Sequence, residues 1–138
     1  MTVAKLVQGV TPDNSVILSM QHSGSLRYYA GRVTMRFDAL RSRWLDTAVS
    51  WLADHGAHPY LLAEDWELDR FRRIFAEQKT VARLDGPPVF VYSGPSRVLL
   101  YDLLRPADWA APVDTIIETF RGPRCLEPTP APTLVLKR

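Results

Sequence analysis

At 138 residues, with 46% hydrophobic and 23% charged residues, the chain has the size and composition of one ordinary globular domain. Its formal net charge of +2, its dispersed arginines and its lack of a nucleic-acid-binding motif exclude a nucleic-acid partner from the expected functions. Cys125 is the single cysteine, which excludes an intrachain disulfide and a cysteine-based metal cluster. No apolar stretch is long enough to span a bilayer, so the chain as given is expected to be soluble.

The first third of the chain alternates helix and strand signals. Apolar residues at helical spacing predict a helix over residues 3–10. Residues 16–20 are apolar almost throughout and predict a strand that is covered on both faces. Residues 33–37 alternate between apolar and polar side chains and predict a half-buried strand. Between these two strands, residues 23–32 predict either a short helix or an extended loop.

Two helices and two further strands are predicted in the middle of the chain. A stripe of apolar residues predicts a helix over 43–55, and Gly56 is the residue expected to end it. A second helix is predicted over 66–78, with Glu64 and Asp65 capping its first turn. The two strands are predicted at 59–63 and 80–84.

The last part of the chain predicts a hairpin and then a proline-rich extension. Strands at 89–92 and 98–103 are separated by the turn residues Ser93-Gly94-Pro95-Ser96. Within the extension only residues 113–120 have the apolar spacing of a short helix, and 122–138 are expected to form a flexible tail. We therefore predict an α/β domain over 1–105 and a partly flexible extension over 106–138.

The order of these elements predicts the fold class. Alternation of strand and helix favours a three-layer α/β/α sandwich with a mostly parallel sheet of about five or six strands. The hairpin of residues 89–103 is expected to form an antiparallel edge of that sheet.

The loop after the first predicted strand is the best candidate for a functional site. In an open α/β sheet, ligands bind outside the carboxyl ends of the strands. Small residues in this loop would let backbone N–H groups approach a phosphate or a carboxylate, while arginine supplies positive charge. The candidate ligand-binding residues are His22, Ser23, Gly24, Ser25, Arg27, Tyr28 and Arg32.

This loop matches no complete catalytic or nucleotide-binding signature. It lacks the Gly-Lys-Ser/Thr end of a Walker loop, the three glycines of the dinucleotide fingerprint and the Gly-x-Ser-x-Gly frame of a nucleophile elbow. A strand-to-helix turn in which Ser23 caps the next element explains the same residues without a ligand. No catalytic residue, metal ligand or cofactor is therefore assigned, and whether the chain is an enzyme stays open.

Three other groupings have simpler structural explanations. The pair His55 and His58 has no third metal ligand, so a solvated turn is expected there. A serine, histidine and aspartate triad built from Ser23, His22 and Asp38 is discarded, because adjacent side chains seldom meet in the required geometry. The acidic residues Glu64, Asp65 and Glu67 are explained by helix capping without any acid–base chemistry.

Several stretches together resemble a known family. The runs SMQHSGSLRYYAGR, TMRFD, PYLLAEDWELDRF and VLLYDL are similar to the soluble C-terminal domain of bacterial GT-C-type membrane glycosyltransferases. These proteins are related to the dolichyl-phosphate-mannose protein mannosyltransferases, and the resemblance covers about residues 3–103.

The resemblance implies a non-catalytic α/β domain on the extracytoplasmic face of a bacterial membrane. The catalytic carboxylate of that family lies in a membrane-embedded region, and no residue of this sequence matches it. The implied partners are a membrane-embedded region of the same protein and a polyprenyl-phosphate sugar or other anionic ligand, contacted through residues 23–32. The alternative is a free-standing small domain or enzyme that binds a phosphate or carboxylate at the same loop.

Overall fold

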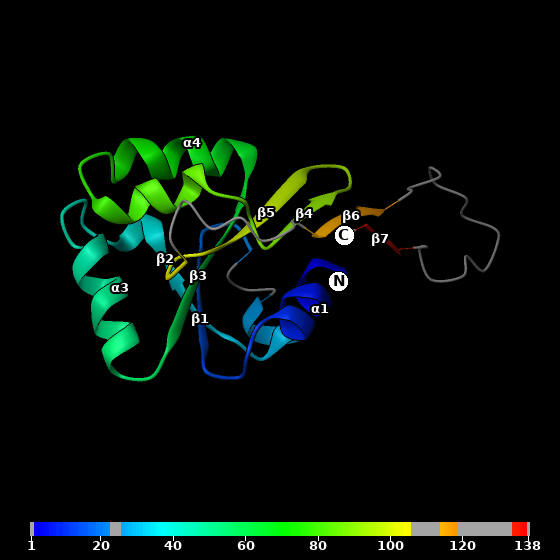
Figure 1. Cartoon of the computed structure of the whole chain (residues 1–138), viewed down its shortest axis with the longest axis horizontal. Helices are drawn as coiled ribbons and strands as arrows, with labels where there is room; N and C mark the ends of the chain where they lie inside the picture. The colour runs from blue at the N-terminus through cyan, green and yellow to red at the C-terminus, as the bar shows by residue number, and fades with distance from the viewer. Residues whose placement is uncertain (1, 23–25, 106–113, 119–133, 138) are drawn as a thin grey trace.

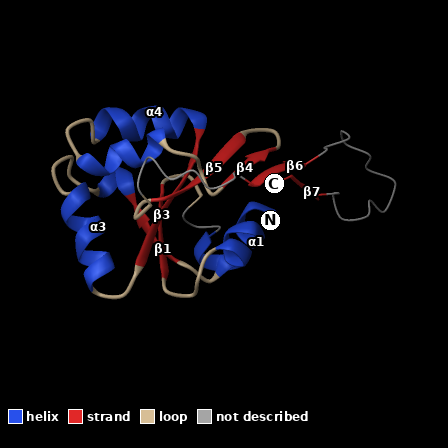
Figure 2. Ribbon diagram, viewed as in Figure 1, coloured by secondary structure: helices blue, strands red, loops and turns tan. Residues whose placement is uncertain are grey.

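A computed structural model of the chain describes residues 2–22, 26–105, 114–118 and 134–137. Its centre is a mixed sheet with the strand order β2-β1-β3-β5-β4-β6-β7, and helices pack beside it (Figures 1 and 2). The predicted α/β class is confirmed. The sheet has seven strands where five or six were expected.

The parallel part of the sheet comes from the first half of the chain. β1 (Ser15–Ser19) lies between β2 (Val33–Arg36) and β3 (His58–Glu64) and runs parallel to both. The chain crosses from β2 to β3 through helix α3 (Leu45–Asp54), and β1 is passed on the way. The chain therefore goes from β1 to one side to form β2, and then to the other side of β1 to form β3. In α/β sheets, ligands bind at the carboxyl ends of the strands where the strand order reverses in this way.

The second half of the sheet is mixed. β5 (Arg97–Asp102) pairs antiparallel with β3 and with β4 (Phe90–Ser93), so the predicted hairpin is present. The hairpin lies inside the sheet and not at its edge, because β6 (Asp114–Glu118) pairs parallel with β4. β7 (Leu134–Lys137) then pairs antiparallel with β6. Parallel and antiparallel strand pairs are therefore more evenly mixed than in the mostly parallel sheet that the sequence predicts.

The helix predicted over 113–120 is wrong, because residues 114–118 form strand β6. In so short an apolar stretch the spacing alone does not separate a helix from a strand, and threonine and isoleucine favour the strand. The expected flexible tail over 122–138 is corrected at its end, where 134–137 form β7. The rest of that tail lies outside the described residues.

The strand predicted over 80–84 is also wrong. These residues belong to the short helix η3 (Lys79–Asp85). Asp46 on α3 accepts hydrogen bonds from the backbone N–H groups of Lys79 and Thr80, both at 2.8 Å, and from the Thr80 hydroxyl at 2.6 Å. A carboxylate that satisfies the free N–H groups of a first turn favours a helical start over an extended one.

Apolar side chains of the central strands alternate between two buried clusters. Leu18 and Leu61 point into a cluster shared with α3, α4 (Asp65–Ile74) and η3. Ile17 and Leu62 point into the other cluster, shared with α1 (Thr2–Val10) and η1 (Leu26–Ala30). Figure 1 shows α3 and α4 on the opposite side of these strands from α1. Burying such a side chain contributes about 1.5–3 kcal/mol, so both clusters hold β1 and β3 in place.

The carboxyl end of α3 lies where the sequence predicts it, whereas α4 ends at Ile74, four residues before the predicted Gln78. Gly56 follows α3 with a φ of 77°, a conformation in which a side chain would be strained. The N–H of Gly56 donates to the Ala53 carbonyl at 3.2 Å and that of Ala57 to the Leu52 carbonyl at 2.8 Å. This pair of bonds is a Schellman motif, with His55 as the cap residue between the end of α3 at Asp54 and the glycine. The chain then turns directly into β3.

Candidate functional site

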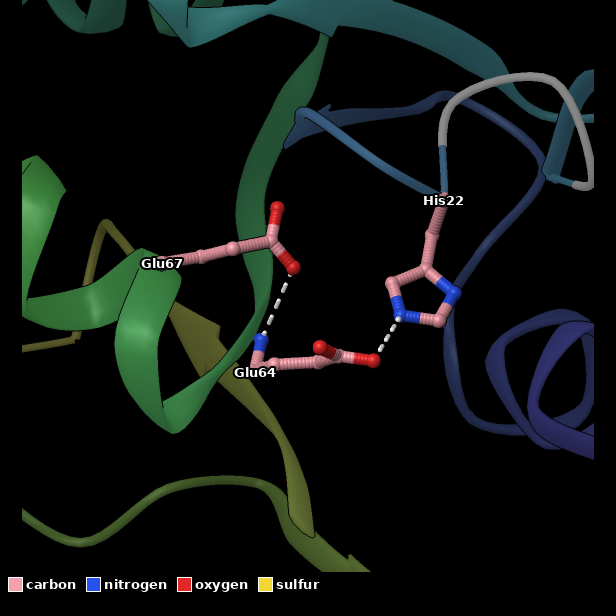
Figure 3. A group of neighbouring side chains, drawn as sticks. All are labelled: His22, Glu64 and Glu67. Carbon is pink, nitrogen blue, oxygen red and sulfur yellow. Dashed lines mark hydrogen bonds and ion pairs between the residues drawn. The ribbon is translucent and has the colours of Figure 1, made fainter. Parts of the chain in front are cut away.

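The candidate site lies where the chain leaves β1 and β3 at their carboxyl ends. Gln21 and His22 follow β1, while Glu64 closes β3 and is also the residue that caps α4. β1 and β3 are adjacent and parallel, so these two exits lie at the same edge of the sheet. Figure 3 shows His22 and the two glutamates facing one another there.

Glu64 and Glu67 form a reciprocal capping box at the start of α4. The Glu64 side chain accepts the backbone N–H of Glu67, and Glu67 Oε1 accepts the backbone N–H of Glu64 at 3.2 Å. The predicted capping role of these residues is confirmed. Carboxylates at this position are also favoured by the positive end of the helix dipole.

Glu67 has a second role that capping does not require. Its Oε2 accepts the backbone N–H of Gln21 at 3.1 Å, which ties the loop after β1 to the start of α4. The Glu67 side chain is fully buried, and no lysine or arginine of the described part of the chain pairs with it. A buried carboxylate without a cationic partner is costly unless hydrogen bonds or a bound cation compensate its charge.

His22 completes the group. Its Nε2 lies 3.4 Å from Oε1 of Glu64, close enough for an ion pair when the ring is protonated. The Nε2 atom is itself buried and has no hydrogen-bond partner among the described residues. Glu64 is held from its other side, where Trp66 Nε1 donates to Oε2 at 2.6 Å. The imidazole is thus aimed at a carboxylate whose position is fixed.

The chemistry of this group differs from that of an anion-binding loop. One imidazole and two carboxylates offer ligand atoms that all lie within 4.8 Å of one another. These are groups that attract a cation, exchange a proton or accept hydrogen bonds from sugar hydroxyls, and they repel a phosphate unless a cation lies between them. From the sequence alone, His22 is a candidate ligand-binding residue, whereas the glutamates are explained by helix capping. His22 and Glu64 each lie where a predicted strand ends. If the two strands had been predicted to pair in parallel, these two residues would have been expected at the same edge of the sheet.

The other residues predicted for the site are dispersed. Ser23, Gly24 and Ser25 lie outside the described residues. Arg27 and Tyr28 lie on η1 with exposed side chains, Tyr28 at 82% exposure. Both are therefore accessible to a ligand or a partner surface.

Arg32 is buried and engaged in the structure itself. Its guanidinium donates to the carbonyls of Thr11 at 2.9 Å, Gln8 at 3.0 Å and Ala30 at 3.4 Å, and to the Thr11 hydroxyl at 3.1 Å. Only 8% of the residue is exposed. These bonds satisfy carbonyls at the carboxyl end of α1, where a positive charge is favoured by the helix dipole.

The histidines and the aspartate that the sequence did not favour as site residues, His55, His58 and Asp38, each contact another group of the protein. His55 Nδ1 lies 2.8 Å from the Trp51 carbonyl, while His58 Nε2 lies 2.7 Å from Asp102 Oδ1. Asp38 accepts two hydrogen bonds from Arg36, and this pairing holds the pKa of the Asp38 carboxyl below its ordinary value. Each of these groups therefore has a structural explanation.

Comparison with known proteins gives no assignment. No family model, no curated protein and no solved structure matches the chain. Among the described residues, none of the helices has the length and apolar character that a membrane span requires.

Proposed function

We propose that this chain is a non-catalytic, extracytoplasmic domain of a GT-C-type membrane glycosyltransferase, and that it engages a ligand where β1 and β3 end. One observation carries the proposal. The two longest runs that resemble this family, residues 19–32 and 59–71, lie apart in the sequence, yet His22 of one contacts Glu64 of the other. The contact joins two of the resembling runs where β1 and β3 end, and this favours a shared binding site there over a shared scaffold alone.

The ligand that fits the proposal is a polyprenyl-phosphate sugar, presented by a membrane-embedded region of the same protein. Trp66 is half exposed, at 48%, and lies directly beside Glu64 through its indole N–H. An exposed indole offers a flat apolar face to a sugar ring or a prenyl chain while its N–H stays bonded. Arg27 and Tyr28 add an exposed cation and a second exposed aromatic ring on η1.

The architecture that goes with this proposal is a three-layer α/β/α sandwich. The two buried clusters on opposite faces of β1 and β3 support it, since each face needs its own covering layer. In such an arrangement the loops after β1 and β3 are left at the edge of the sheet, where they remain accessible to a ligand.

A thermal-shift series with purified protein tests the proposal. We expect a short-chain polyprenyl phosphate sugar to stabilise the protein, by roughly 2.7 kcal/mol at about a hundred times its dissociation constant. His22→Ala should lose this stabilisation. His55→Ala should keep it, because His55 is an exposed histidine at the end of α3. Stabilisation that is absent in the wild type, or equal in both variants, would contradict the proposal.

The same series separates the rival function. A free-standing domain that recognises a phosphate or a carboxylate should respond to a sugar phosphate as strongly as to the polyprenyl compound. A response that needs the prenyl chain supports the membrane-associated function, and a response to the small phosphate alone supports the rival.

A further inference from the structure

We propose that His22, Glu64 and Glu67 form a binding site for a divalent metal ion, with Zn²⁺ as the best-fitting ion. The inference rests on the geometry of these three side chains and does not depend on the proposed function. It assigns to Glu64 and Glu67 a role beyond the capping box that they form.

The donor set and its spacing fit zinc. Imidazole nitrogen and carboxylate oxygen are both ordinary zinc ligands, with metal–ligand distances of about 2.0–2.2 Å. Two ligands of a tetrahedral ion are then about 3.4 Å apart. Nε2 of His22 and Oε1 of Glu64 lie 3.4 Å apart, and the ligand atoms of all three residues lie within 4.8 Å of one another. Three protein ligands leave the fourth position of the ion open, as in catalytic or ligand-binding zinc sites.

The unsatisfied Nε2 atom of His22 points to an occupant independently of the carboxylates. It is buried, and in the part of the chain that the structure describes it has no hydrogen-bond partner. Buried polar atoms are rarely left in this state, because the unmade bond costs about 1–3 kcal/mol. A metal ion between Nε2 and Glu64 gives the nitrogen lone pair a partner without moving the backbone.

The charge of Glu67 supports the same conclusion. This carboxylate is fully buried beside Glu64. Within the described residues, its two oxygens accept hydrogen bonds from two backbone N–H groups, those of Gln21 and Glu64. Each carboxylate oxygen has a second lone pair, so both can keep these bonds and still bind an ion. Two carboxylates would neutralise a doubly charged ion in a place where one buried negative charge is otherwise uncompensated.

The hydrogen bonds around the group would orient the ligands for the ion. Trp66 Nε1 holds Oε2 of Glu64, leaving Oε1 turned toward His22. The backbone N–H groups of Gln21 and Glu64 fix both oxygens of Glu67. Such outer hydrogen bonds are what fixes ligand geometry in metal sites. The competing arrangement, a protonated His22 paired with Glu64, uses the same contact without a metal and predicts no metal binding.

Calorimetric titration of untagged, chelator-treated protein with Zn²⁺ tests the inference. We expect one ion per chain, and binding at least about 100-fold weaker in His22→Ala and in Glu64→Gln. Glu64→Gln retains an acceptor oxygen for Trp66 and for the cap. Glu67 is left unchanged because it is buried inside the capping box. His58→Ala is the matched control, since His58 faces Asp102 elsewhere on the sheet, and it should bind zinc as the wild type does.

Three results would overturn the inference. The first is the absence of stoichiometric zinc binding to the wild type. The second is equal binding by the wild type and His22→Ala, and the third is a loss of binding in His58→Ala. Zinc binding without any response to the polyprenyl compound would leave this site in place and contradict the proposed function alone.

Discussion

Arg32 illustrates how an arginine near a polar loop can be engaged by the backbone and not by a ligand. From sequence, its position after a serine and glycine loop suggests an anion-binding cation. The structure shows its guanidinium bonded to the carbonyls of Gln8, Thr11 and Ala30. No sequence pattern predicts the bonds to Gln8 and Thr11, because those residues lie more than twenty positions earlier in the chain. His22 was a candidate from sequence, since it belongs to the loop after a buried strand, at the edge of the sheet where ligands bind.

Replacing Arg32 with alanine should destabilise the protein by about 3 kcal/mol, because the carbonyls that it satisfies at the end of α1 lose a charged donor. Its salt bridge to Asp13, at 3.6 Å, adds little, because the Asp13 side chain is fully exposed. Urea unfolding measures the change. Arg36→Ala is the control: Arg36 pairs with Asp38 at the surface, so little change is expected there. Equal effects of the two substitutions would show that Arg32 is not a structural group.

At the scale of elements, the sequence predicted those features that depend only on residues close together in the chain. The capping box of α4 and the glycine after α3 are encoded within a few residues, and both are present. η3 and β6 were mistaken because their conformations depend on distant partners. η3 starts against Asp46, more than thirty residues earlier, and β6 pairs with β4 across the sheet. A short apolar stretch adopts the structure that its partner offers.

The bonds to Asp46 make a prediction about pH. Burial by itself would raise the pKa of the Asp46 carboxyl, but hydrogen bonds from Thr80 and from the backbone of Lys79 outweigh it and hold that pKa below its ordinary value. A lowered folded-state pKa stabilises the protein above the unfolded value of about 3.9, and this stability is lost as the pH falls through the folded-state pKa.

Asp46→Asn should therefore be less stable than the wild type near neutral pH, and the difference should shrink from about pH 4 downward. Urea midpoints measured between neutral pH and about pH 2 give the comparison. Asp54→Asn, an exposed change at the end of the same helix, should follow the wild type throughout. A difference between Asp46→Asn and the wild type that stays constant into acid would exclude the proposed linkage.

For the whole molecule, alternation of strands and helices was enough to predict the α/β class, but not the order of the strands. The parallel set of β2, β1 and β3 follows from the crossover helix that the sequence shows. The place of the hairpin in the sheet does not follow, because it depends on strands that pair beyond residue 105. The candidate site lies in the predictable part, where the sequence offered His22 as a candidate, whereas its contact with Glu64 depends on the pairing of β1 with β3.

We have proposed that a ligand binds where β1 and β3 end. The most direct measurement is a two-dimensional amide NMR titration of the chain with a short-chain polyprenyl phosphate sugar, with and without Zn²⁺. We predict that the shifts concentrate on Gln21, His22 and the first turn of α4, and that the resonances of α3 stay unchanged. Shifts that avoid these residues, or gather on the exposed face of α3 around Trp51, would contradict the account.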